Sequence, residues 1–357
     1  MNDGALREEI AALLARPHAR VESAEVERLA VRLFQWQYAR NPVLARVADA
    51  ALDGREVRGI DEIPAVPTEV FKHARVACFA PERTVRTFRT SGTTQDLRGE
   101  HPFEDLALYE AAAESAAKRW LIPRSANRVV LLASDEGEAP DSSLSFMLAR
   151  FATLWGARER AFFITRGALD AEGAERAIEE AAQQGVPVAL LGAAYGFVHL
   201  VDAMGARSVS LPEGSVVMPT GGFKGRSREV APDAFHAMLQ GRFGVARSQI
   251  VGEYGMTELS SQAYEAHAEG CAPGEFRAPP WMRVTAVDPV SLERVEDGEV
   301  GLIRVVDLAN VGSSVAIQTS DLGRVTARGF EVLGRAPGAT PRGCSRALDA
   351  ALSGESP

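Results

Sequence analysis

The pattern of apolar and polar positions predicts helices in the first part of the chain. Apolar residues recur at helical spacing over residues 5–15 and 24–39. The second pattern stops near Asn41 and Pro42, a pair typical of a helix boundary. Residues 60–76 contain two prolines and predict an irregular connector.

The middle of the chain alternates between short apolar strands and amphipathic helices. We expect a strand at 84–90 and helices at 105–121, 143–155 and 171–184. Buried strands are predicted at 128–133, 161–165, 186–191, 215–219 and 248–252. Such alternation is typical of an α/β fold with a largely parallel sheet.

Beyond residue 281 the pattern changes to β-rich segments separated by Asp-Gly and Arg-Gly turns. We therefore expect four parts along the chain. They are an N-terminal helical segment (1–60), an α/β core (61–280), a β-rich subdomain (281–335) and a short C-terminal tail (336–357).

Composition and charge narrow the class of protein. Hydrophobic residues make up 46% of the 357 residues, and the net charge is −9, which argues against a broad basic surface for nucleic acid. The longest apolar run, 186–201, is too short to span a bilayer, so no membrane span is expected. Three scattered cysteines and an acidic start without a secretory signal favour a cytoplasmic protein.

A first motif combines hydroxyl groups with glycine after a predicted strand. Its residues are Thr90, Ser91, Gly92, Thr93 and Thr94. Backbone N–H groups and hydroxyls in such a loop can surround a phosphate, although the Walker A ending is absent. A solvated turn is the alternative interpretation.

Two further motifs carry carboxylates. In the segment 252–258, Tyr254 offers an aromatic face, Thr257 a hydroxyl and Glu258 a hard oxygen ligand for Mg²⁺. The alternative is a strand end followed by a helix with a threonine cap. In the segment 319–323, Asp321 would lie in a turn between strands and could bind the hydroxyls of a ribose, or be an ordinary turn residue.

The order of these motifs resembles the consensus blocks of the adenylate-forming superfamily, which contains acyl-CoA synthetases, adenylation domains and luciferases. Further blocks make the chain similar to the LuxE-type acyl-protein synthetases, the long-chain-fatty-acid luciferin-component ligases; they lie at 34–37, 63–72, 219–225 and 342–345. The resemblance implies an N-terminal-type α/β core with parallel-rich sheets flanked by helices and a small β-subdomain. The superfamily's large C-terminal domain would be absent or vestigial.

The resemblance also implies a reaction, in which a carboxylate attacks the α-phosphate of ATP and gives acyl-AMP and pyrophosphate. Residues 90–94 would hold the ATP phosphates, Thr257 would contact the α-phosphate and Glu258 would bind Mg²⁺. Asp321 would bind the ribose, and Arg335 would lie at the hinge that ends the core. The remaining nucleotide-site residues would be Gly221, Gly222, Gly252, Glu253, Tyr254, Gly255 and Met256.

The cations of this site depart from the superfamily pattern. Gln95 replaces the usual glycine of the phosphate loop, and Arg98 is the cation nearest to the missing loop lysine. Only three lysines occur, and none lies in the tail, where the superfamily's catalytic lysine would be. We therefore expect Lys224 to neutralise the reacting carboxylate and phosphate, with a surface lysine as the equal alternative.

The other two lysines have plainer expectations. For Lys72 we expect a structural ion pair, and for Lys118 a place at a helix end. His101 and His199 could enter the site as proton or carboxylate partners. For His199, on an apolar stretch, a buried core histidine is the commoner explanation.

The acyl group needs an acceptor. Cys344 lies between Arg342 and Arg346 in the short tail, and neighbouring cations lower the pKa of a thiol. The resemblance implies an acyl-enzyme on a cysteine near the C-terminus, so Cys344 is the candidate nucleophile, carried by a mobile tail. A small packing residue is the alternative; Cys78 is expected in the core, and Cys271 is the reserve candidate.

The sequence therefore predicts an ATP-dependent acyl-protein synthetase that uses a carboxylic acid, by family default a long-chain fatty acid. Its partner would be an acyl reductase, an acyltransferase or a carrier protein. One alternative is a CoA or carrier-protein ligase of the phenylacetate-CoA ligase type. A second, of another class, is a non-catalytic homologue that binds a nucleotide or an acyl group.

Overall fold

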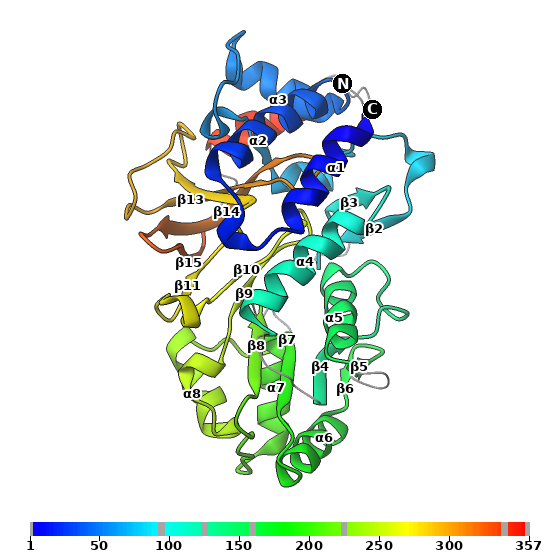
Figure 1. The fold of residues 1–357 in the computed structure, drawn as a ribbon, viewed down its shortest axis with the longest axis vertical. Helices are drawn as coiled ribbons and strands as arrows, with labels where there is room; N and C mark the ends of the chain where they lie inside the picture. The colour runs from blue at the N-terminus through cyan, green and yellow to red at the C-terminus, as the bar shows by residue number, and fades with distance from the viewer. Residues whose placement is uncertain are drawn as a thin grey trace. The chain divides into compact units, whose positions relative to one another are not determined.

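The computed structural model describes residues 3–91, 97–122, 128–156, 162–222, 227–336 and 342–353 (Figure 1). The chain divides into two compact units. The first unit contains residues 1–115, 256–262 and 277–357, and the second unit contains residues 116–255 and 263–276. The N-terminal helices and the β-rich segment after residue 281 therefore belong to one unit.

Helices lie close to most of the positions that periodicity predicts. They are α1 (Asp3–Leu14), α2 (Ser23–Tyr38), α3 (Pro42–Leu52), α4 (Ala107–Trp120), α5 (Ser143–Leu154), α6 (Ala171–Gln183), α7 (Ala194–Met204), α8 (Pro232–Phe243) and α9 (Arg342–Leu352). Lys118 lies in the last turn of α4, as expected. No helix in the described ranges is both long enough and apolar enough to cross a membrane.

The second unit contains the predicted parallel sheet. Within its described residues the strand order is β10-β9-β8-β7-β4-β5-β6 (Figure 1). Parallel pairs join β4 to β5 and β7, and join β8 to β7 and β9, whereas β6 and β10 are antiparallel to their neighbours. The strands are β4 (Arg128–Ser134), β5 (Phe162–Thr165), β6 (Ala168–Leu169), β7 (Val188–Ala193), β8 (Val216–Thr220), β9 (Glu253–Tyr254) and β10 (Ala263–Tyr264).

The β-rich segment forms an antiparallel sheet in the first unit, in the order β12-β13-β14-β15. Its strands are β12 (Met282–Val287), β13 (Gly301–Asp307), β14 (Ala316–Val325) and β15 (Phe330–Arg335), and β1 (Val66–Pro67) pairs in parallel with β14. A separate hairpin joins β2 (Arg86–Arg89) to β3 (Glu100–Phe103). Short strand β11 (Glu275–Phe276) precedes β12 in the chain.

The core of the second unit explains why its sheet can be nearly all apolar. Strands β4, β7 and β8 contribute residues such as Val130, Leu190 and Val217, all fully buried. Helices α6, α7 and α8 cover them with Ile178, Phe197 and Leu239, among others. Because parallel strands are covered by crossover helices, each strand is a continuous apolar run rather than an alternating one.

Several predicted elements differ from the structure. Helix α2 ends just before Asn41, as expected. Asn41 also begins a helix that was not predicted, since its side chain accepts hydrogen bonds from Val43 N and Leu44 N and caps α3. Residues 248–252 do not form a strand, since Arg247–Gln249 form a 3-10 helix and Ile250 makes a single bridge to Val217. Within the short C-terminal tail, residues 342–352 form α9, a helix that was not predicted and that aligns Cys344, Leu348 and Ala351 on one apolar stripe.

Candidate active site

The base of the predicted phosphate loop lies in the β2–β3 hairpin of the first unit. Thr90 closes it, since its N–H donates to the Gly99 carbonyl at 2.9 Å and its hydroxyl accepts from Gly99 N at 2.9 Å. The approach is close, since a Cβ on Gly99 would lie 3.1 Å from the Thr90 methyl carbon. Arg98 donates to the Thr90 carbonyl at 2.6 Å. Ser91 is exposed, and the remaining loop residues Gly92, Thr93, Thr94 and Gln95 lie outside the described residues.

Polar side chains from distant segments of the first unit hold the backbone of Thr257 and Glu258. His101 on β3 lies 2.8 Å from the Thr257 carbonyl through Nδ1, and Asn310 Nδ2 donates to the Glu258 carbonyl at 2.8 Å. Burial lowers the pKa of His101 to about 4, so the ring is neutral at physiological pH. Since a carbonyl only accepts, Nδ1 carries the ring proton.

Residues that follow Glu258 are anchored in the same way. Asp307, fully buried, accepts from Ser260 N at 3.0 Å and from Ser261 N at 2.8 Å. The segment 310–315 is in turn held by Gln37 of α2, which donates to the Asn310 carbonyl at 2.7 Å and accepts from Val315 N at 2.8 Å. Gln37 belongs to the family-like block 34–37, so this block stabilises the segment whose Asn310 binds the Glu258 carbonyl.

Glu258 is a buried carboxylate in a mixed field of charges. Burial raises its pKa to about 7, and the positive charges of Arg335 and Lys72 oppose that effect while Asp321 adds to it. A divalent cation would compensate for the lost hydration of this carboxylate, and Mg²⁺ is usually held by one or two carboxylates together with phosphate oxygens and water. Glu258 therefore fits a magnesium ligand, although no cluster of three metal-binding side chains occurs in the described ranges.

Asp321 and Arg335 face each other across two strands. Asp321 on β14 is in register with Arg335 on β15, and their charged groups are 3.6 Å apart. The expectation that Asp321 lies in a turn is wrong: Asp-Leu-Gly suggested a turn, but β14 runs through it with a register irregularity at Leu322 and Gly323. Arg335 is 83% exposed in its side chain and ends β15, so it retains surface for a ligand.

The remaining predicted nucleotide residues lie mainly in the second unit. Gly221 follows β8 with φ at +62°, a conformation that favours glycine, and Gly222 is exposed beside it. Thr220 donates its hydroxyl to the Glu253 carboxylate, and both residues are buried. Tyr254 is also buried, with its ring 6.0 Å from that of Phe276. The segment then leaves this unit, since Gly255 is its last residue there and Met256 belongs to the first unit.

Glu265 holds the start of this motif and was not predicted. Its carboxylate accepts from Gly252 N at 2.9 Å, and its own N–H donates to the Gly252 carbonyl at 3.0 Å. Arg247 donates to the same carboxylate at 2.7 Å. Nothing in the spacing of these residues marks them, because the contact joins a strand edge to a loop thirteen residues away.

Replacing Glu265 by glutamine is expected to destabilise the fold in a pH-dependent way. Burial alone would raise the pKa of Glu265, but hydrogen bonds from His267 and Arg247 outweigh it and lower the pKa to about 2. A depressed carboxyl pKa stabilises the protein above the unfolded value near 4.5, and this stability is lost as pH falls towards 2. The variant should lose roughly 2 kcal/mol at pH 7 and show a smaller difference at pH 3.

Urea unfolding at both pH values measures this effect. The matched control is Glu213→Gln, which changes an exposed glutamate of the same unit and should be neutral. A Glu265→Gln protein as stable as the wild type at pH 7 would show that the Arg247 contact contributes no net stability.

Cys344 does not lie in a mobile tail as expected. It is in α9, 2% exposed, and belongs to a buried cluster with Val287 and Leu302. Burial raises the pKa of its thiol to about 11, opposite to the expected lowering by neighbouring arginines. Cys78, expected in the core, is half-buried, and burial raises the pKa of its thiol to about 12, whereas Cys271 is buried.

The remaining candidate residues are two lysines and a histidine. Lys224 lies outside the described residues, so its predicted role stays a prediction. Lys72 makes the expected ion pair, with Nζ 2.8 Å from Glu69, and it also contributes positive charge at Glu258. His199 is exposed on α7, so the expectation of a buried core histidine is wrong.

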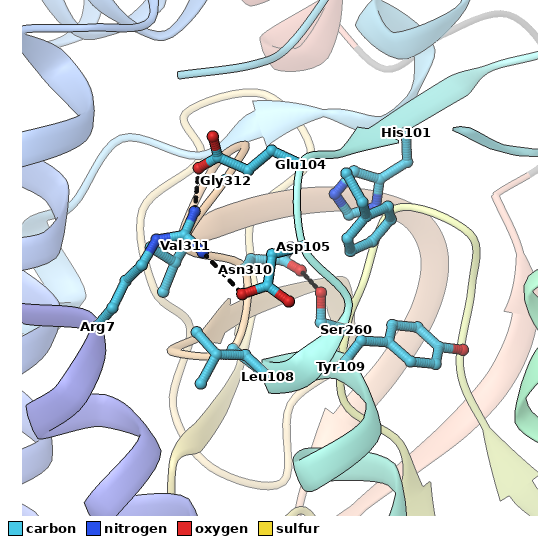
Figure 2. A pocket seen from close by; sticks show the side chains of 12 residues that line it. Arg7, His101, Glu104, Asp105, Leu108, Tyr109, Ser260, Asn310, Val311 and Gly312 are labelled. Atoms are coloured by element: carbon cyan, nitrogen blue, oxygen red, sulfur yellow. Dashed lines mark hydrogen bonds and ion pairs between the residues drawn. The ribbon is translucent and has the colours of Figure 1, made fainter. Parts of the chain in front are cut away.

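Cavities in the described part of the first unit do not coincide with the predicted nucleotide residues. The cavity in Figure 2 has a volume of about 10 Å³, room for about one water molecule, and it is lined by His101, Ser260 and Asn310 among others. A larger cavity of about 630 Å³ is lined by Arg7, Trp36, Cys78 and neighbouring residues. Neither contains Glu258, Asp321 or Arg335.

Comparison with family models shows the family to which this chain belongs. A family model described as "Acyl-protein synthetase, LuxE" matches residues 44–353. The chain belongs to the LuxE acyl-protein synthetase family. This LuxE-family chain is 22% identical over 309 residues to a long-chain-fatty-acid–luciferin-component ligase of Aliivibrio fischeri, covering 84% of this chain and 79% of that protein. A Vibrio harveyi protein of the same name is 23% identical over 323 residues, covering 88% and 81%.

Solved structures give the fold of this LuxE-family protein. A 2-hydroxyisobutyryl-CoA ligase in complex with 2-HIB-AMP and CoA matches with a TM-score of 0.63 at 14% identity, covering 87% of this chain and 75% of that chain. ATP-bound MatB from Rhodopseudomonas palustris matches with a TM-score of 0.51 at 18% identity and covers 71% of this chain. The LuxE-family chain spans about half of MatB, 48% of its length. The predicted family, enzyme class and adenylate-forming fold are confirmed.

Proposed function

We propose that this protein activates a carboxylic acid with ATP, forms acyl-AMP and transfers the acyl group to a thiol. The observation that supports the proposal is the buried carboxylate of Glu258, whose charge interacts with those of Asp321 and Arg335, in a chain that matches the LuxE family model over residues 44–353. ATP use is supported by the fold, which the chain shares with ATP-bound MatB. A fatty acid is the proposed substrate, by analogy with the named luciferin-component ligases.

The chain's own residues would bind and orient the reactants. Thr257 would donate its hydroxyl to the α-phosphate, and Asp321 would accept hydrogen bonds from the ribose hydroxyls. Bound Mg²⁺, held by Glu258, would screen the repulsion between the phosphates and the incoming carboxylate. Thr90 and Ser91, with Gly92, Thr93 and Thr94, would hold the phosphates that leave as pyrophosphate. Gly221, Gly222 and the segment 252–256 would frame the adenine and the acyl carboxylate.

The second half of the proposal is transfer of the acyl group to Cys344. The thiolate would attack the acyl carbonyl and release AMP, so that a thioester forms and the mixed anhydride breaks. Cys344 belongs to a small buried cluster with Val287 and Leu302, and Leu322 and Ala336, which directly follow Asp321 and Arg335 in the chain, pack against that cluster. The proposed final acceptor is a partner acyl reductase, acyltransferase or carrier protein.

Carboxylate-dependent exchange of labelled pyrophosphate into ATP tests the first half-reaction. A panel of short, aromatic and long-chain acids should include at least one that supports exchange, and we expect a fatty acid to be best. Product analysis with and without CoA then separates the acceptors, since a CoA ligase needs CoA for thioester release. An enzyme that binds Mg·ATP but exchanges with no acid would instead indicate a non-catalytic nucleotide-binding homologue.

A pair of lysine variants tests the source of the missing cation. If Lys224 neutralises the reacting carboxylate, Lys224→Ala should reduce exchange by about 100-fold, the size expected for one preorganised charge contact. Lys72→Ala is the matched control, because Lys72 already pairs with Glu69 and acts on Glu258 only as a partly exposed charge. Unchanged exchange in Lys224→Ala would refute the role of Lys224.

A further inference from the structure

His101 joins two of the predicted catalytic segments. It is 1% exposed on β3, and Nδ1 lies 2.8 Å from the Thr257 carbonyl. Its ring is enclosed by Phe103, with ring centres 4.2 Å apart, and by Phe71 at 5.7 Å. Figure 2 shows the same side chain at the small cavity that Ser260 and Asn310 also line. The ring therefore has one orientation, set by packing on both sides.

The strand that carries His101 is tied to the base of the phosphate loop. Gly99, two residues before His101, exchanges hydrogen bonds with Thr90. His101 itself is in register with Phe88 on β2, the strand that leads into the loop. Residues 99 to 101 therefore connect Thr90 to the Thr257 carbonyl through hydrogen bonds at both ends of one short stretch of backbone.

We propose that His101 is a positioning residue for catalysis: its Nδ1–H holds the Thr257 carbonyl and thereby fixes the Thr257 hydroxyl relative to the base of the phosphate loop. This inference rests on the proposed function and assigns a role that the sequence left open. His101 does not touch a reactant. It acts through Thr257, whose hydroxyl would meet the α-phosphate.

Loss of the His101 hydrogen bond would change the geometry of the Thr257 segment more than the stability of the fold. A buried carbonyl that loses its donor tends to move towards another partner, and the Thr257 side chain moves with its backbone. A shift of about 1 Å at a reacting group can reduce the rate by about 100-fold. Asn310 still holds the next carbonyl, that of Glu258, so loss of His101 should tilt the segment rather than unfold it.

Three substitutions at His101 separate the donor from the ring. In His101→Asn the amide nitrogen is the same number of bonds from Cα as Nδ1, so the donor is kept. In His101→Gln the donor is one bond farther out, and in His101→Phe the ring is kept without a donor. Exchange kinetics, Mg·ATP binding by calorimetry and thermal unfolding are measured on each, with His199→Phe, at an exposed position of α7, as the control.

We expect His101→Asn to keep kcat within about threefold of the wild type, and His101→Phe and His101→Gln to lose about tenfold or more in kcat. The KM for the acid should change little, because the acid does not meet this contact, whereas Mg·ATP affinity should fall in the Phe and Gln variants. His101→Phe with wild-type kcat and Mg·ATP affinity would overturn the proposal. Equal losses in the Asn and Phe variants that follow their unfolding temperatures would also overturn it.

Failure of this inference is distinguishable from failure of the proposed function. If the wild type shows no exchange with any acid, the proposed function fails, and calorimetry still decides whether His101 orders the Mg·ATP site. If the wild type exchanges and the donor makes no difference, only the role of His101 is wrong.

Discussion

Replacing Glu258 by glutamine is expected to reduce carboxylate-dependent exchange by about 100-fold or more, because the amide cannot supply the anionic oxygen that Mg²⁺ prefers. The same change should not weaken the fold. Burial already disfavours the charged form of Glu258, and a neutral amide of the same length removes that cost. We therefore expect loss of exchange with an unfolding temperature equal to or above that of the wild type.

Exchange assays over a range of Mg²⁺ concentrations, with thermal unfolding in parallel, check this expectation. Loss of a ligand should raise the Mg²⁺ concentration needed for half-maximal exchange. Glu213→Gln, at an exposed position, is the control for loss of one carboxylate. Wild-type exchange in Glu258→Gln would remove Glu258 from the metal site and with it the main support for the proposed reaction.

The fold could be predicted from the sequence wherever hydrophobic periodicity determines an element. Strand β4 and helix α6 follow from patterns of adjacent residues, and together they imply the parallel sheet. Helix α7 escaped prediction because strand β7 runs directly into it within one apolar stretch, 186–201, where the pattern has no polar face to mark the change. The strand expected at 248–252 does not form, although its apolar residues are buried. Burial alone does not make a strand, and Ile250 makes only one bridge to a neighbouring strand.

The candidate site could be predicted only in part. Thr257, Glu258 and Asp321 are candidates because they stand in motifs whose residue types suit a nucleotide, and their roles stay predictions. The residues that support the backbone of Thr257 and Glu258 were not assigned that role, since His101, Asn310 and Gln37 act on backbone groups 52 to 278 residues away in the chain. A hydrogen bond to a carbonyl can come from any polar side chain, so it leaves no recognisable spacing.

Cys344 shows how the environment of a candidate residue can be predicted wrongly. Two flanking arginines suggested a lowered thiol pKa, but the flanking residues do not show by themselves that the thiol is buried. The thiol lies on the apolar stripe of α9, where burial dominates and raises its pKa to about 11. The sequence contains this information as the spacing of Cys344, Leu348 and Ala351, which is helical.

Replacing Cys344 by alanine is expected to abolish the covalent acyl-enzyme while leaving pyrophosphate exchange within about twofold of the wild type. Adenylation precedes thiol attack, so its rate does not depend on the thiol. Mass spectrometry after incubation with ATP and the best acid should find a thioester on Cys344 in the wild type. Cys271→Ala is the matched control, since it removes another buried thiol and should keep the acyl-enzyme.

The environment of Cys344 adds a constraint on how this transfer can occur. A pKa raised from 9 to about 11 leaves about 100-fold less thiolate at neutral pH, so alkylation of Cys344 by iodoacetamide should be about 100-fold slower in the folded protein than in urea. Transfer to Cys344, as proposed, would need α9 to move so that the thiol leaves its cluster with Val287 and Leu302, and the hydrogen bond from Arg46 to the Ala351 carbonyl at 2.7 Å opposes that movement. Arg46→Ala should speed both alkylation and acyl-enzyme formation several-fold. A thioester on Cys271, or on no cysteine, would refute transfer to Cys344 and leave a partner's thiol as the direct acceptor.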